Sequence, residues 1–407
     1  MKKRLFLIDL VSNFMFDVVI VGGGLNGITL ASMLANRSLK ILLIDQNKIS
    51  DRLGAKQDGR GIAVARFSKE ILENHGIWKH FKVDHGTINK IIVADGTEPF
   101  LLKLDNDLVG GDPLGYIIEH DDLLQQFYAY ATKCKNLTIL DDTKLLDFVF
   151  AQGFVKLNLN KKKNIKSKLL VAADGKNSSI KQQLNIESST FDYNQSALVF
   201  TVKHEKKHNN VAYEHFYKAG PFALLPLQDQ HKSSVVWTES SDSAKIYAKM
   251  SKDEISYFIQ QKCQLTHGKI EIASKIFSYP LSLVFAHKYY EQRAVLLGDS
   301  LHFIHPIAGQ GFNLSLRDID NLANLIIEYN DLGLDIGSDD LLSKFTRGRK
   351  FDNYMMIVFT DILNRSFSNN IKVLSCLRKL GLSLIGIWPF WKKFLMGYAW
   401  TKKSKSL

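Results

Sequence analysis

The residue types best suited to chemistry in this chain lie between positions 293 and 326. Arg293–Leu297 is a short apolar run of strand type. The segment His305–Leu314 reads HPIAGQGFNL, and the apolar residues of Asn313–Ile326 recur at helical spacing. These patterns predict a strand, a glycine-rich loop and a helix that begins near Gly311.

A loop of this kind would suit a redox cofactor. The N-terminus of a helix offers unpaired N–H groups and about half a positive charge, which favour the anionic edge of a reduced flavin ring. Gly309 and Gly311 would let the backbone approach the ring, and Pro306 would stiffen the loop. Gly298 and Asp299 end the strand, where the carboxylate could accept hydrogen bonds from ribityl hydroxyls. Taken alone, the same pattern also fits an ordinary strand, turn and helix.

A second motif near the start of the chain has the spacing of a dinucleotide-binding turn. The buried-strand pattern Phe16–Val21 is followed by glycines in the order G-x-G-x-x-G. Gly22 would permit the tight turn, Gly24 would let a pyrophosphate approach the backbone, and Gly27 would let the next helix pack against the strand. That helix is predicted over Ile28–Asn36.

Two acidic residues follow two further predicted strands. Lys40–Ile44 reads as a strand and ends at Asp45, which lies 23 positions after Gly22 (45 − 22). A carboxylate at about this distance can bind the ribose hydroxyls of adenosine. Lys168–Ala173 also reads as a strand and ends in a turn that begins at Asp174. Strand, glycines, helix, strand and acid in this order favour a bound dinucleotide.

The three motifs occur in order along one chain, and together they resemble the flavoprotein aromatic hydroxylases of the p-hydroxybenzoate hydroxylase type. Shorter blocks are similar to one branch of that family, the ubiquinone-biosynthesis hydroxylases. These blocks are Asp58–Ala63, Gly115–Glu119, Gly220–Leu227, Val235–Trp237 and Tyr279–Leu281.

The resemblance implies an α/β fold. A Rossmann-like FAD-binding domain would carry an inserted substrate domain with an antiparallel sheet, and helices would follow at the C-terminus. Strand-like runs such as Ser196–Val202 and Ser233–Thr238 agree with the inserted sheet. The expected segments are 15–77, 114–183 and 280–330 for the FAD-binding domain, 78–113 and 184–279 for the substrate domain, and 331–407 for a C-terminal helical region with a basic, aromatic tail.

The resemblance also implies a reaction. Reduced FAD would react with O2 to give the flavin C4a-hydroperoxide, which would hydroxylate the aromatic ring of a polyprenylated phenol in ubiquinone biosynthesis. No second nicotinamide domain is visible, so NAD(P)H would bind transiently or a protein electron donor would supply the electrons. The residues expected to face the flavin in catalysis are Pro306, Gly309, Gln310 and Gly311.

The residues expected to bind the cofactor come from all three motifs and from two shorter matches. No general base can be named, because His302 and His305 are equally compatible with structural roles in the loop. The expected cofactor-binding residues are Gly22, Gly24, Gly27, Asp45, Arg60, Gln125, Asp174, Gly298, Asp299, Gly311, Phe312 and Asn313.

Composition agrees with a globular intracellular enzyme. The chain has 407 residues, of which 45% are hydrophobic. It is therefore long enough and apolar enough to form two sizeable cores. Cys134, Cys263 and Cys376 have neither C-x-x-C nor metal-ligand spacing, so we expect reduced thiols, no metal site and a cytoplasmic location. The leader before Met15 lacks a cleavage site and predicts no export, and either Met1 or Met15 could be the start.

The C-terminal tail is strongly basic. No acid follows Asp361, whereas nine lysines and arginines do, and Leu380–Trp391 is an uncharged run with aromatic residues. This run is too short to span a bilayer, which needs roughly 20 residues. The pattern predicts peripheral contact with the inner face of the membrane, and with it a possible quinone-biosynthesis complex. A helix that caps the core is the alternative, and nucleic-acid binding is not expected.

Two other classes of protein share part of this pattern. A prenyl-chain reductase or halogenase of the same fold would have the glycine motif but not the block His305–Asn313. A non-catalytic flavoprotein that scaffolds a biosynthetic complex would be supported only by the tail. The sequence does not specify the ring position, the prenyl chain length or the oligomeric state.

Overall fold

Parallel strands build the sheet that carries the glycine motif in the computed structural model of the protein. The structure describes residues 15–35, 37–53, 59–83, 85–96, 102–160, 163–263 and 266–367. Buried apolar residues fill these strands, as expected where both faces of a sheet are covered. In spatial order the parallel strands are β19 (Ala294–Leu296), β11 (Lys163–Ala172), β1 (Met15–Val21), β2 (Ile41–Ile44) and β8 (Leu137–Leu140).

Three antiparallel strands extend this sheet, and four helices of ten or more residues are among those that contribute to the largest apolar core. The strands are β9 (Leu145–Ala151), β10 (Phe154–Leu159) and β18 (Tyr290–Glu291). The helices are α2 (Leu25–Leu34), α5 (His120–Ala131), α9 (Gln310–Asp331) and α10 (Asp339–Phe367).

Helix α2 begins three residues before the predicted start at Ile28. Gly24 has extended backbone angles and caps the helix, so Gly27 lies in the first turn and not in the preceding loop. A Cβ atom at Gly27 would lie 1.9 Å from the carbonyl oxygen of Gly22. The helix can therefore start this close to the strand only because residue 27 has no side chain.

A second sheet of nine strands in the described ranges is almost entirely antiparallel, as the resemblance implied. The exception is β13, which runs parallel to β5. In spatial order the strands are β20 (His302–Phe303), β17 (Phe277–Ala286), β12 (Ser188–His204), β15 (Lys232–Ser240), β14 (Gly220–Pro226), β13 (Val211–Tyr217), β5 (Lys90–Asp95) and β6 (Leu102–Asp105), with β16 (Ile270–Ile272) paired to β12.

Alternation along these strands gives the second sheet two different faces. On β12, Leu198 and Phe200 point toward α7 (Ser241–Tyr247) and α8 (Lys252–Lys262), with which they form an apolar core. Ala197 and Val199 point to the other side and line a large cavity. Residues 235 and 237 of β15 face the helices in the same way, whereas residues 236 and 238 face the cavity.

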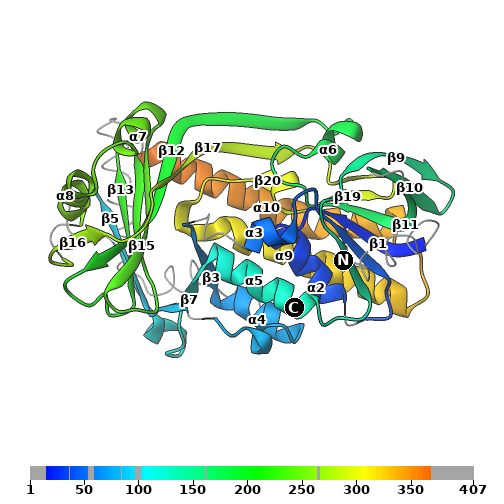
Figure 1. Ribbon diagram of the computed structural model, residues 1–407, viewed down its shortest axis with the longest axis horizontal. Coiled ribbons are helices and arrows are strands. Elements are labelled where there is room, and N and C mark those ends of the chain that lie inside the picture. The colour runs from blue at the N-terminus through cyan, green and yellow to red at the C-terminus, as the bar shows by residue number, and fades with distance from the viewer. Residues whose placement is uncertain are drawn as a thin grey trace.

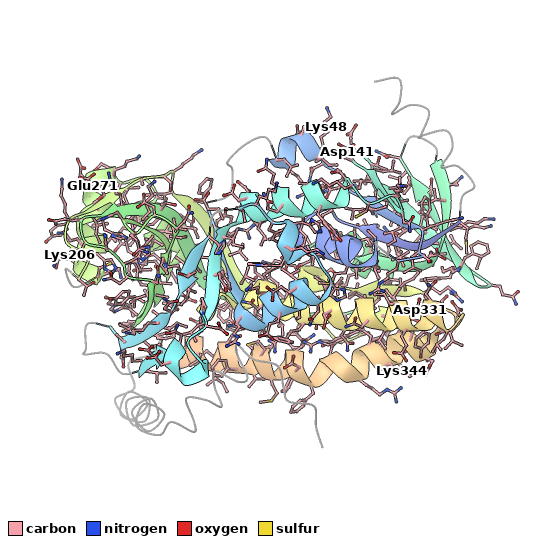
Figure 2. The ribbon with its side chains drawn as sticks, turned by 90° about the horizontal axis from the view of Figure 1, so that it is seen from below. Lys48, Asp141, Lys206, Glu271, Asp331 and Lys344 are labelled. Atoms are coloured by element: carbon pink, nitrogen blue, oxygen red, sulfur yellow. The ribbon has the colours of Figure 1, made fainter. Side chains whose placement is uncertain are left out.

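Strands β12 and β17 run along the top of the molecule in Figure 1 and connect the two sheets. Figure 2 shows Lys206 and Glu271 at one end of the molecule and Asp331 and Lys344 at the other. The predicted boundary between the substrate domain and the FAD-binding domain lies at residue 280, in the middle of strand β17. Residues of β17 on both sides of this boundary pair with β12 in the second sheet. The division into domains stays a prediction.

A small sheet and several short helices connect the two larger sheets. None of the helices within the described ranges is long and apolar enough to cross a membrane. The small sheet contains β3 (Gly61–Ala65), β7 (Gly115–Glu119) and β4 (Gly86–Ile88). The short helices are α3 (Ile49–Leu53), α4 (Arg66–Asn74) and α6 (Ser179–Gln183), and the 3-10 turns are η1 (Trp78–His80), η2 (Asn106–Val109), η3 (Gly298–Ser300) and η4 (Ile307–Gly309).

Candidate active site

The polar residues predicted to bind a dinucleotide gather at one edge of the parallel sheet. Gly22 follows β1, Asp45 follows β2, Asp174 lies two residues after β11, and Asp299 lies three residues after β19. Because these strands are parallel neighbours, their carboxyl ends share this edge. In open α/β sheets, ligands bind outside the carboxyl ends of the strands.

The glycine turn leaves open space in front of the first helix. Gly22 has a φ of 110°, and a Cβ atom there would lie 2.1 Å from the carbonyl oxygen of Ala173, so a side chain is excluded. By contrast, a Cβ atom at Gly24 would have no neighbour within 4 Å. Gly24 also lines the cavity. The turn is therefore fixed at Gly22 and open toward the cavity at Gly24.

Asp45 holds the glycine turn in place. Its carboxylate is only 2% exposed and accepts hydrogen bonds from the N–H of Gly23 at 2.5 Å and the N–H of Asn47 at 2.7 Å. The guanidinium of Arg52 pairs with it at 2.8 Å. The hydroxyl of Tyr128 donates to the carbonyl of Gly23, and burial raises the pKa of this phenol well above its ordinary value. The sequence patterns identified Asp45 but gave no signal for Arg52 or Tyr128, which lie on α3 and α5.

Asp174 and Asp299 differ in the number of hydrogen bonds that their carboxylates accept. One oxygen of Asp174 accepts the N–H groups of Ser179 and Ile180, whereas the other is buried without a hydrogen-bond partner among the described residues. Asp299 accepts a hydrogen bond from Asn26 at 3.3 Å. Burial raises the pKa of Asp299, against the opposing influence of nearby His302 and Arg60. Both carboxylates line the cavity and can accept hydrogen bonds from a ligand.

The glycine-rich loop ends where helix α9 begins, one residue before the predicted Gly311. Gly309 caps the helix with a φ of 62°, and no side chain caps the helix end. A Cβ atom at Gly311 would have no neighbour within 4 Å. The first turn of α9 therefore opens onto the cavity with its N–H groups uncapped by side chains, which favours an anionic ligand edge.

Asn313 lines the same cavity, but its side chain forms hydrogen bonds within the protein. Its amide oxygen accepts hydrogen bonds from the N–H of Ala65 and the hydroxyl of Ser68, and its nitrogen donates to the carbonyls of Ala63 and Gly309. Three of these bonds tie the start of α9 to β3 and α4, and the fourth ties it to the residue that caps α9. Asn313 thus positions the loop, and its expected contact with the cofactor stays a prediction.

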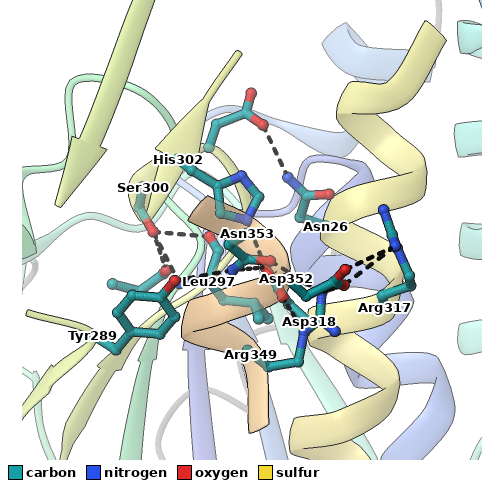
Figure 3. A network of polar contacts seen from close by, with 12 residues as sticks. Asn26, Tyr289, Leu297, Ser300, His302, Arg317, Asp318, Arg349, Asp352 and Asn353 are labelled. Atoms are coloured by element: carbon teal, nitrogen blue, oxygen red, sulfur yellow. Dashed lines mark hydrogen bonds and ion pairs between the residues drawn. The ribbon is translucent and has the colours of Figure 1, made fainter. Parts of the chain in front are cut away.

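A buried polar network anchors α9 and α10 behind the loop (Figure 3). Asp318 is fully buried and pairs with His302 at 2.5 Å and with Arg349 at 2.6 Å. Asn353 donates to Asp318 and to the hydroxyl of Tyr289, both at 3.2 Å. Burial would raise the pKa of Asp318, but the ion pairs with Arg349 and His302 lower it overall. His302 is therefore held by Asp318.

His305 is fully buried directly before Pro306, and neither of its ring nitrogens has a partner among the described residues. The imidazole packs edge-on against Tyr193, with ring centroids 5.3 Å apart. Burial lowers the pKa of His305 to about 3, so the ring is neutral at physiological pH. His305 is not among the residues that line the cavity.

The cavity connects the dinucleotide edge of the first sheet to the inner face of the second. Its volume is about 1340 Å³, whereas pockets for one small ligand measure about 300–1,000 Å³. Gly27, Gly298 and Gln125 do not line it, and Gln125 is exposed on α5. The predicted site residues that line it are Gly22, Gly24, Asp45, Arg60, Asp174, Asp299, Pro306, Gly309, Gln310, Gly311, Phe312 and Asn313.

The far half of the cavity is apolar apart from a few side chains. Strands β12, β14 and β15 present mainly small aliphatic residues there. Glu214 of β13 also lines this half, and burial raises the pKa of its carboxyl to about 8. The guanidinium of Arg60 lies over the ring of Tyr279, 5.3 Å from its centroid. Sequence patterns did not single out Glu214, although it is an acid between apolar residues on an alternating strand.

These residues fit an FAD molecule by their chemistry. Gly24 leaves space for a pyrophosphate, Asp45 places a carboxylate at the end of the second strand, and Asp174 has a buried oxygen that lacks a donor among the described residues. The uncapped first turn of α9 suits the anionic edge of the flavin. The cavity has room for this cofactor and, beyond it, for a substrate.

Comparison with known proteins supports the same conclusion. The FAD binding domain family matches residues 15–350. The chain is 34% identical to the ubiquinone hydroxylase UbiL of Rhodospirillum rubrum over 94% of this chain and 89% of that protein. It is 30% identical to the ubiquinone hydroxylase UbiM of Neisseria meningitidis, over 93% and 83%, and 28% identical to the human mitochondrial ubiquinone biosynthesis monooxygenase COQ6, over 94% and 92%.

Solved structures show the same fold at low sequence identity. The p-nitrophenol 4-monooxygenase PnpA of Pseudomonas putida superimposes with a TM-score of 0.78 at 14% identity, over 96% of this chain and 100% of that one. The protein PqsL of Pseudomonas aeruginosa gives a TM-score of 0.77 at 17% identity, over 91% of this chain and 99% of that one. The chain therefore belongs to the FAD binding domain family and, within it, to the FAD-dependent monooxygenases of the ubiquinone-hydroxylase type.

Proposed function

We propose that this enzyme inserts one oxygen atom from O2 into the aromatic ring of a polyprenylated phenol during ubiquinone biosynthesis. The observation that carries the proposal is one continuous cavity, which joins the dinucleotide edge to an apolar space under the second sheet. A phenol ring in that space would lie between the flavin-facing loop and β14, and an apolar chain would contact the aliphatic residues around it. The names of the relatives UbiL, UbiM and COQ6 support this substrate class.

The bound FAD supplies the activation of O2 and the transfer of one oxygen atom. In this proposal Gly24 and Asp45 hold the adenosine diphosphate half, while Asp174, Asp299 and Arg60 hold the ribityl and pyrophosphate region. Gly309, Gln310 and Gly311 hold the ring edge at the N-terminus of α9, and Pro306 keeps the loop stiff. The apolar wall excludes water from the site of oxygen transfer.

An oxygen-incorporation assay tests the proposal. The purified FAD-loaded protein is incubated with NAD(P)H, a prenylated phenol and isotopically labelled O2. We expect O2 consumption that depends on the phenol, and a product that carries one labelled oxygen atom on the ring. A prenyl reductase would add hydrogen without labelled oxygen, and a scaffold would leave the phenol unchanged. Either result would rule out the proposed reaction.

The reductant and the cellular location belong to the same proposal. NAD(P)H would bind transiently at the FAD domain, or a partner protein would supply electrons. The enzyme would work in the cytoplasm, peripherally at the inner face of the membrane and within a quinone-biosynthesis complex. The tail predicted to contact the membrane, residues 368–407, lies outside the described residues.

A further inference from the structure

Glu214 is an acidic side chain on the apolar wall of the cavity. It lies on β13, where alternation directs Ala212, Glu214 and Phe216 to the same face, and all three line the cavity. Its partners in the sheet are Val93 of β5 and Ala223 of β14, which also line the cavity. The carboxyl is therefore surrounded by apolar neighbours on its own strand and on both adjacent strands.

The carboxyl of Glu214 has no structural partner. None of the described residues forms a hydrogen bond or an ion pair with it, although the half-buried side chain lies on an apolar wall of the cavity. A carboxylate on an apolar wall is less well solvated than one in bulk water, so placing it there without a protein partner costs free energy. A ligand that donates a hydrogen bond from within the cavity would offset this cost.

Glu214 also lies close to the loop proposed to face the flavin. Phe216, two residues along the same face, packs in one apolar cluster with Ile307, and Val93 packs against that cluster. Ile307 directly follows Pro306 in the loop. The carboxyl thus lines the same part of the cavity as the atoms around which oxygen transfer would occur.

The pKa of Glu214 is close enough to that of a phenol for a proton to pass between the two groups. Burial alone raises its pKa to about 8, and no neighbouring charge contributes to the shift. A free phenol side chain has a pKa of about 10, so the two groups differ by only about two units. Strand β14 presents no ionisable residue. The ionisable groups elsewhere on these walls are Asp95, which shares the face of β5 by alternation, together with Tyr213, Tyr279 and Arg60.

We propose that the carboxylate of Glu214 accepts the hydroxyl proton of the bound phenol as oxygen is transferred to the ring. The O–H bond of the phenol breaks, an O–H bond forms on Glu214, and the electron pair left on the phenol oxygen increases the electron density of the ring carbons beside and opposite it. The proton returns to solvent after product release. This step requires no oxidant beyond the O2 of the monooxygenase reaction, and it rests on the proposed phenol substrate.

The first test compares turnover by Glu214→Gln with that of the wild type. The substitution keeps shape and removes the proton acceptor, so we expect normal FAD content and a kcat about 100-fold lower at pH 8. In the wild type kcat should rise with pH toward about 8, and in the variant this rise should disappear. Ring-fluorinated substrate, whose hydroxyl ionises without help, should recover most of the lost rate. The control is Glu271→Gln, an exposed acid at the outer end of the same sheet (Figure 2).

The second test measures binding and is independent of turnover. A prenylated phenol and its methyl ether are titrated into the FAD-loaded proteins at pH 6 to 9, with flavin fluorescence as the signal. A hydroxyl donated to a carboxylate binds more strongly than one donated to a carboxylic acid. The affinity for the phenol should therefore rise through about pH 8 in the wild type only, and that for the ether should not change.

The outcomes separate this proposal from the proposed function. Hydroxylation by the wild type together with full activity and an unchanged pH profile in Glu214→Gln would overturn the role of Glu214 alone. No hydroxylation, with phenol binding that still depends on pH and on Glu214, would overturn the proposed reaction but support the hydrogen bond to the carboxylate. Identical pH dependence for phenol and ether, or no binding of the phenol, would overturn the role of Glu214.

Discussion

Two glycines of the same turn should respond to substitution in opposite ways. A Cβ atom at Gly24 meets nothing within 4 Å, and its φ of −70° is open to any residue. We expect Gly24→Val to fold, with a melting temperature near that of the wild type, but to lose FAD because the side chain occupies the pyrophosphate position. Absorbance of the purified protein and titration with FAD measure this.

The matched comparison is Gly27→Val. Its Cβ atom would lie 1.9 Å from the carbonyl oxygen of Gly22, so this variant should lose stability as well as FAD. If Gly24→Val retained FAD at wild-type affinity, the pyrophosphate could not lie at this turn, and the assignment of the motif would fail.

Glu214 should also leave a signature in the pH dependence of stability. Its pKa rises from 4.5 to about 8 on folding, so between these values the folded protein binds a proton that the unfolded chain has lost. The stabilising contribution is therefore fully present below pH 4.5 and is lost as the pH rises to about 8. We expect the melting temperature of Glu214→Gln, relative to the wild type, to increase from pH 5 to pH 8. An equal difference at both pH values would contradict the burial of an unpaired carboxyl.

The single residues that could be predicted are those whose role depends on local spacing. Gly22, Gly24 and Asp45 follow strands at distances set by the length of the turn and of one helix. These distances can be counted directly in the sequence. Arg52 pairs with Asp45 from a separate helix, and Glu214 becomes unusual only because β5 and β14 surround it with apolar residues. Such environments depend on tertiary packing, and no motif marks them.

Helices α9 and α10 depend on the ion pairs of Asp318 (Figure 3). Asp318→Asn should remove one of the two carboxylates that pair with the buried guanidinium of Arg349 and leave only Asp352, at 2.7 Å. Breaking a buried pair by removing one partner typically costs about 3–5 kcal/mol. We expect a loss near the lower end of this range in the free energy of unfolding, measured with urea. The control is Asp331→Asn at the exposed end of α9, which should change the free energy by less than about 0.5 kcal/mol.

The pH dependence of this network has the opposite sign to that of Glu214. Because folding lowers the pKa of Asp318 below 3.8, its contribution is present above that value and is lost as the pH falls through the folded pKa. The wild type should therefore lose stability below about pH 4 more steeply than Asp318→Asn does. Parallel acid-unfolding curves would contradict the assigned ion pairs.

Helices and strands were predictable where the apolar residues of a segment follow one regular spacing. The apolar runs of β1, β2 and β11 mark strands covered on both faces, and α9 shows helical spacing over most of its length. The extent of β12 was not predictable from Ser196–Val202, because most residues of its first half are partly or fully exposed and no buried apolar run marks them. Pairing across the sheet, and not local pattern, determines where that strand begins.

At the level of the whole molecule, the two sheets enclose a cavity that neither could form alone. The parallel sheet contributes the polar residues at its carboxyl edge, and the second sheet contributes the apolar wall on the face not covered by α7 and α8. The residues Phe359, Leu363 and Phe367 of α10 complete this wall. The same helix also exposes Phe351, Tyr354 and Ile362 to solvent, and Phe359 is itself partly exposed. An exposed apolar helix face beside the cavity would favour entry of a substrate from a lipid surface.

The charge of the molecule leads to the final prediction. Of the nine basic residues after Asp361, eight lie in residues 371–407, which contain no acid. Removing this segment should abolish binding to vesicles that contain phosphatidylserine and leave the flavin spectrum unchanged, because each lysine near an anionic surface contributes about 1 kcal/mol. Raising the salt concentration should weaken binding of the full-length protein, since these charges are screened within a Debye length.

A second variant separates charge from insertion of aromatic residues. Replacing Trp388, Phe390 and Trp391 by Ser keeps every charge, so any remaining vesicle binding would be purely electrostatic and should vanish at high salt, whereas wild-type binding should persist in part. Neutral phosphatidylcholine vesicles provide the control for charge. Loss of FAD or aggregation of the truncated protein would instead identify residues 371–407 as a cover for the apolar core, and the membrane contact would then have to come from the exposed face of α10 or be absent.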